Sequence, residues 1–92
     1  MQRYVVLAKF TDAIDEKTIA EGTPQITAVC ESHGGSVVDA YLTMGALDIV
    51  LVLDFPGNGE CAAAMLEYAQ KGLLTTQTMP AFSAADWADL AS

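Results

Sequence analysis

The sequence predicts an α+β fold with one four-stranded antiparallel sheet. Four stretches rich in β-branched and aromatic residues alternate with segments of helical spacing, in the order β-α-β-β-α-β. Only a tight turn separates the second and third strands, which favours antiparallel pairing between them. The chain has 92 residues, so we expect one domain over residues 1–92.

The first half of the chain supplies a strand and a helix. Residues 3–10 are typical of a strand, and residues 13–22 predict a turn or a short helical piece. Thr23 is then expected to cap a helix that has Pro24 at its first position. Glycines at 34–35 should end that helix, because glycine readily adopts a left-handed conformation.

The second half predicts a hairpin around Met44-Gly45, a helix that ends at Gly72, and a fourth strand. These three elements cover residues 36–43 with 46–54, residues 60–71, and residues 73–82. The apolar stripe expected on the second helix consists of Ala62, Met65, Leu66 and Ala69. Ser83 and Asp86 resemble a capping box for a short C-terminal helix that carries Trp87.

This order of elements is that of a ferredoxin-like domain, in which both long helices cover one face of the sheet. The other face should be polar if water covers it. Val50 and Val52 nevertheless alternate with the residues assigned to the helix side, and Val5 and Leu7 do the same in the first strand. We therefore expect a second copy to pack sheet against sheet, which gives a dimeric α+β barrel with a pocket between the sheets.

The composition narrows the possible partners. Twelve acidic residues face four cations, for a net charge of −8, and the cations are scattered. Nucleic acids and anionic membrane surfaces are therefore not expected as partners. No apolar run is long enough to span a bilayer, and no segment reads as a signal peptide, so the expected location is cytoplasmic.

The strand-turn-strand segment 41–50, YLTMGALDIV, resembles the signature of the GYD domain proteins, a family of small, uncharacterised proteins in the dimeric α/β barrel superfamily. Residues 10–12, 34–35, 75–76 and 81–83 are similar as well. The resemblance implies a ferredoxin-like fold and pairing into a barrel, and it implies no established activity. Gly45, Ala46 and Asp48 fit the motif, but Leu47 stands where the family has tyrosine, so a role that uses the phenol is not expected here.

Asp48 is the strongest candidate for a functional residue, because a carboxylate is unusual in such an apolar segment. It could line the pocket between the sheets as a hydrogen-bond acceptor or a base. It could instead accept backbone N–H groups near Gly45, which is the commoner role of an Asp beside a turn, or pair with a lysine of a partner chain. Tyr41 and Thr43 share a face of the second strand and complete the candidate binding set of Tyr41, Thr43, Gly45 and Asp48.

The remaining reactive side chains favour structural roles. His33 is the only histidine and falls at a helix end, so a three-ligand metal site is not expected. Cys30 and Cys61 fall in helices without metal-ligand spacing, and we expect them to be buried free thiols. No metal or cofactor is therefore anticipated.

Two classes of function remain open. The first is a homodimeric module that binds a small apolar metabolite or serves as an assembly unit. The second is a cofactor-independent enzyme, similar to a monooxygenase or an isomerase, that uses Asp48 and Tyr41 on a small apolar or aromatic substrate. The first is favoured because no convergent catalytic set is visible, and likeness of fold alone is weak support for an activity.

Overall fold

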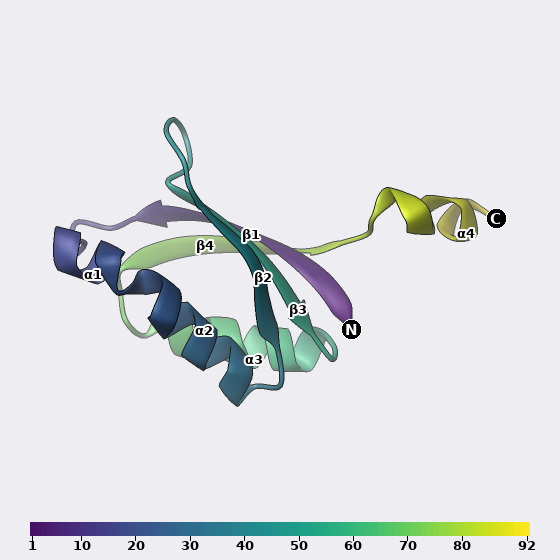
Figure 1. The fold of residues 1–92 in the computed structure, drawn as a ribbon, viewed down its shortest axis with the longest axis horizontal. Helices are drawn as coiled ribbons and strands as arrows, with labels where there is room; N and C mark the ends of the chain where they lie inside the picture. Colours follow the sequence, from purple (N-terminus) through teal and green to yellow (C-terminus); the bar gives the residue numbers. More distant parts are fainter.

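A computed structural model describes all 92 residues. Helices and strands follow in the order seen in Figure 1, with a 3-10 turn (η1) before the last helix. Their bounds are β1 Gln2–Phe10, α1 Glu16–Ala20, α2 Gly22–Ser32, β2 Ser36–Leu42, β3 Ile49–Phe55, α3 Asn58–Ala69, β4 Leu74–Ala81, η1 Ala84–Asp86 and α4 Trp87–Ala91. The ferredoxin-like α+β prediction is thereby confirmed.

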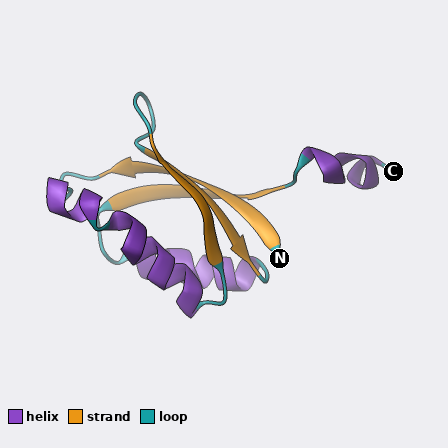
Figure 2. Cartoon of the chain, in the orientation of Figure 1, coloured by secondary structure: helices purple, strands orange, loops and turns teal.

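The four strands form one antiparallel sheet in the order β2-β3-β1-β4. Val5 of β1 lies opposite Val52 of β3 on one side and Met79 of β4 on the other. The long helices α2 and α3 lie together on one side of the sheet (Figure 2). Residues directly opposite one another project to the same face, so this register fixes which side chains face the helices.

The core lies between the sheet and these two helices. Eleven buried residues form it: Tyr4, Val6, Ile26, Val29, Cys30, Leu51, Leu53, Phe55, Cys61, Ala64 and Tyr68. The strand faces assigned from alternation are correct, because Leu51 and Leu53 are buried whereas Val50 and Val52 lie on the side that no helix covers. We call that side the open face of the sheet.

The expected start of α2 was wrong by two residues. The helix begins at Gly22, and Glu21 serves both as its N-cap and as the C-cap of α1. Helix α1 in turn starts at a capping box, in which the Asp15 carboxylate accepts the Thr18 N–H at 2.8 Å. Pro24 is tolerated inside α2 because the first backbone N–H groups of a helix have no partner within it.

The third strand also starts later than expected. β2 ends at Leu42 and β3 begins at Ile49, so residues 43–48 form a projecting loop rather than a tight turn (Figure 1). The Thr43 N–H donates to the Asp48 carbonyl at 2.7 Å, and the Thr43 hydroxyl donates to the Leu47 carbonyl at 2.6 Å. These bonds close the loop at its base and leave Gly45, at φ +127°, near its tip.

The buried stripe of α3 is only in part the expected one, because Met65 packs against the core whereas Ala62, Leu66 and Ala69 are exposed. Cys61, Ala64 and Tyr68 are buried, whereas Leu66 is 70% exposed. The two stripes lie side by side on the helix, and alanines in both made them hard to separate by hydrophobicity alone. The rotation of α3 that buries Cys61 and Ala64 matters because it also directs the Tyr68 ring into the core.

The C-terminal segment extends away from the domain (Figure 1). Ser83 does not form the expected capping box, because its hydroxyl bonds the Asp86 carboxylate at 3.1 Å and no side chain caps a backbone N–H there. Phe82, Trp87 and Leu90 are 49%, 63% and 59% exposed. We call residues 82–92 the C-terminal arm.

Candidate functional site

The four residues of the expected binding set occupy one end of the β2–β3 hairpin. Tyr41 is in β2, Thr43 and Gly45 are in the loop, and Asp48 directly precedes β3. Tyr41 lies opposite Val50, which places it on the open face. Their grouping follows from the hairpin, and their role in binding stays a prediction.

The Asp48 carboxylate is bonded to the backbone of the neighbouring strand. Its Oδ2 atom accepts the Phe10 N–H at 2.8 Å, and the Asp48 N–H donates to the Ala8 carbonyl at 2.9 Å. The side chain thus takes the place of a strand carbonyl where β1 and β3 stop pairing. This geometry favours a structural role, although the bonded group is the end of β1 rather than the turn near Gly45.

Tyr41 and Gly45 do not converge with that carboxylate on one enclosed space. Tyr41 is 55% exposed, and its hydroxyl makes no hydrogen bond within the chain. A Cβ at Gly45 would meet no atom within 4 Å, so the loop tip is open on every side. Within one protomer Gly45 and Tyr41 therefore lie on open surface, and Tyr41 also borders the cavity on the helix side of β2 that is described below.

The open face carries an apolar centre between polar ends. Val5, Leu7, Val50, Val52 and Met79 are all half-buried and occupy adjacent positions in the register. At one end Arg3 pairs with Asp54, with Nε and Oδ1 3.0 Å apart. The hydrogen bond and the charge of Asp54 raise the pKa of Arg3. The opposite end carries Lys9 and Thr75.

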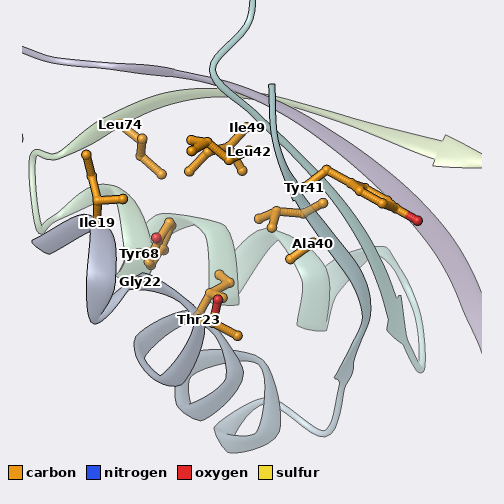
Figure 3. A pocket seen from close by; sticks show the side chains of 11 residues that line it. Ile19, Gly22, Thr23, Ala40, Tyr41, Leu42, Ile49, Tyr68 and Leu74 are labelled. Carbon is orange, nitrogen blue, oxygen red and sulfur yellow. The ribbon is translucent and has the colours of Figure 1, made fainter. Parts of the chain in front are cut away.

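A separate cavity lies on the helix side of the sheet, beneath the edge strand β2 (Figure 3). Its volume is about 120 Å³, and nine of its eleven lining residues are hydrophobic. Ile26, Leu51 and Tyr68 are buried at its floor, whereas Ile19 and Leu42 are partly exposed at its mouth. The sequence interpretation placed its pocket only between two sheets and missed this one.

Two signals in the sequence could have led to this cavity. The Asp15 capping box would have defined α1, which places Ile19 at the mouth. The spacing of Cys61, Ala64 and Tyr68 would have turned the Tyr68 ring inward. The cavity forms because the side chains from α1, α2, α3 and the β2 edge meet without filling the space between them.

The two thiols are buried and unpaired, as expected. Burial raises the pKa of Cys30 to about 11, with a smaller contribution from Cys61, and burial also raises the pKa of Cys61. Both thiols therefore stay protonated and weakly nucleophilic at neutral pH. They serve as small core residues in this structure.

His33 is the C-cap of α2, at the helix end where it was expected. Its Nε2 atom lies 3.6 Å from a Glu67 carboxylate oxygen on α3. No three His, Cys, Asp or Glu side chains come together in a group that could hold a metal ion. None of the helices combines the length and apolar character that crossing a membrane requires.

The chain is similar to known proteins both in sequence and in fold. The sequence profile of the GYD domain matches residues 4–91. Among solved structures, FFRP-DM1 is 19% identical at a TM-score of 0.65, and the match covers 89% of this chain and all of that one. The hypothetical protein PHS023 from Pyrococcus horikoshii is 18% identical at 0.64, with 94% and 95% covered.

A third solved structure, LrpC of B. subtilis, is 17% identical at a TM-score of 0.58 over 89% of this chain, which spans 51% of that protein. At such identities the likeness concerns the fold alone. A comparison with curated proteins finds no match.

Proposed function

The chain belongs to the GYD domain family, and on that premise we propose that it is a homodimeric module which pairs through the open face and holds a small apolar metabolite between the two sheets. The observation that carries this proposal is the apolar centre of the open face. A sheet face that is exposed to water ordinarily carries polar side chains. On the open face, five adjacent positions are instead aliphatic or Met.

A second copy is the occupant that the surface fits. Protein interfaces usually have an apolar centre that is surrounded by polar and charged groups. Arg3 with Asp54 and Lys9 with Thr75 supply the polar ends. A net charge of −8 makes polyanions poor competitors for the same face.

The energy of pairing through the sheet alone is modest. Burying the part of each half-buried apolar side chain that is still exposed contributes about 1 kcal/mol. The five residues of the apolar centre, taken from two copies, therefore contribute about 10 kcal/mol. Association itself costs about 4–15 kcal/mol. Further contacts are therefore needed, and the exposed apolar residues of the C-terminal arm can supply them by packing on the partner.

Binding is favoured over catalysis by the state of Asp48. A general base needs a carboxylate that is free to take a proton from a substrate. Here the Oδ2 atom is held by the Phe10 N–H, and Tyr41 does not converge with it on an enclosed space. The enzyme hypothesis therefore lacks a base in a defined pocket.

Native mass spectrometry of the protein purified from its source tests the proposal. The expected spectrum contains a species of twice the protomer mass and, under gentle activation, a small neutral molecule released from it. A spectrum that contains protomers alone at micromolar concentration would contradict pairing. A dimer that never carries a small molecule would instead favour a role in assembly only.

A further inference from the structure

We propose that the cavity beneath β2 is a second binding site, which takes a neutral single-ring molecule with one hydroxyl or carbonyl oxygen, and that the Tyr68 hydroxyl is its hydrogen-bond donor. The site lies within one protomer and on the helix side of the sheet. It therefore does not depend on pairing through the open face.

The size of the cavity sets the size of the ligand. An apolar cavity of about 150 Å³ in another protein stays dry and binds benzene. The cavity beneath β2 has a volume of about 120 Å³ and walls formed by Ile19, Ile26, Leu42 and other apolar side chains. One six-membered ring is thus a group of the size that this space holds.

Tyr68 provides the polar recognition. Its side chain is 9% exposed, yet its hydroxyl has no partner in the chain, in contrast to the Tyr4 hydroxyl, which bonds Asn58 at 2.5 Å. Buried hydroxyl groups are ordinarily satisfied. The Tyr68 oxygen is not sealed in the core, since it makes no hydrogen bond in the chain and retains some access to solvent. An oxygen atom of a ligand in the cavity would satisfy it.

The arrangement of the walls supports entry from the β2 edge. Figure 3 places Tyr68 on the α3 side of the cavity, across from Ile49 and Leu42 of the sheet. Leu42 is 68% exposed and Ile19 is 39% exposed, so the mouth opens between β2 and α1. Burial raises the pKa of Tyr68, which keeps the phenol protonated as a donor.

The test uses phenol and benzene as probes and follows the backbone amides of the ¹⁵N-labelled protein by NMR. Both probes should shift the amides of Ile19, Ile49 and Leu74. Tyr68→Phe should weaken phenol binding roughly three- to tenfold, the range expected for one net hydrogen bond, and leave benzene binding unchanged. The matched control is Tyr4→Phe, which removes a buried hydroxyl outside the cavity and should not alter either affinity.

A second variant keeps the test decisive if Tyr68→Phe does not fold. Leu42→Asp places a charge at the exposed mouth and should weaken both probes. The proposal is overturned if neither probe shifts these amides, because the cavity then takes up no ring. It is also overturned if Tyr68→Phe binds phenol as tightly as wild type, or if the shifts appear at Val5 and Met79 but not at Ile19, since neither Val5 nor Met79 adjoins a lining residue of the cavity along its strand.

Discussion

Replacing Asp48 by alanine tests whether this carboxylate holds the sheet together. The substitution removes the acceptor of the Phe10 N–H, a bond of 2.8 Å in a partly buried setting. A hydrogen bond to a charged group contributes about 1.5–3 kcal/mol. Because water can reach this edge of the sheet, we expect a loss of about 1–2 kcal/mol in the free energy of unfolding.

Thermal unfolding followed by circular dichroism measures that loss. One kcal/mol corresponds to roughly 4–8 °C in a domain of this size, so Asp48→Ala should lower the Tm by about 4–16 °C. Asp48→Asn retains an oxygen that can accept the same N–H and should cost about 0.5 kcal/mol. All variants are compared at one protomer concentration, because the stability of a dimer depends on concentration.

Asp12→Ala is the matched control, since Asp12 is exposed and the substitution changes the net charge equally. The structural role of Asp48 is refuted if Asp48→Ala unfolds at the same temperature as Asp12→Ala. An Asp48→Ala variant that keeps its stability but loses a co-purifying ligand would instead assign Asp48 to the binding site.

Three further predictions concern the core and the arm. Gly35→Ala should destabilise the fold by about 3 kcal/mol in a urea titration, because the new Cβ would lie 2.5 Å from the Asp54 carbonyl oxygen and also against the Phe55 ring; an unchanged midpoint would disprove this close approach. The free energy of unfolding should fall between pH 9 and pH 11, because the Cys30 thiol, with its pKa raised from 9.0 to about 11, stays neutral in the folded state after it ionises in the unfolded chain; Cys30→Ala should flatten this decline, and an equally steep decline in that variant would assign it to other groups. Deleting the C-terminal arm, residues 82–92, should leave the NMR spectrum of the core intact, because no core residue lies there, while dimer dissociation becomes easier; loss of the core spectrum would show that the arm is needed for folding.

The sheet and its two faces could be predicted from alternation alone. The pattern of Leu51 and Leu53 against Val50 and Val52 depends only on the two-residue period of a strand, which survives small errors in strand ends. The order of elements then leaves few topologies open. Fold class and the two-sided apolar character of the sheet were therefore accessible without coordinates.

The cavity and the hydrogen bonds of Asp48 were not accessible in this way. Asp48 bonds Phe10, which is far away in the sequence, and no local pattern indicates that register. The two candidate stripes of α3 differ by a small rotation of the helix, and that rotation decides whether Tyr68 enters the core. Gly35 was read as part of a helix stop, whereas its hydrogen side chain is needed because Phe55 packs against it.

Light scattering on wild type and on Val52→Lys tests the central claim, pairing through the open face, most directly. Val52 lies at the centre of that face, and Gln70→Lys adds the same charge at an exposed helix end as a control. Across micromolar concentrations the account predicts twice the protomer mass for wild type and Gln70→Lys, and a folded monomer for Val52→Lys. A wild-type protein that stays monomeric throughout, or a Val52→Lys variant that dimerises as tightly as wild type, would contradict it.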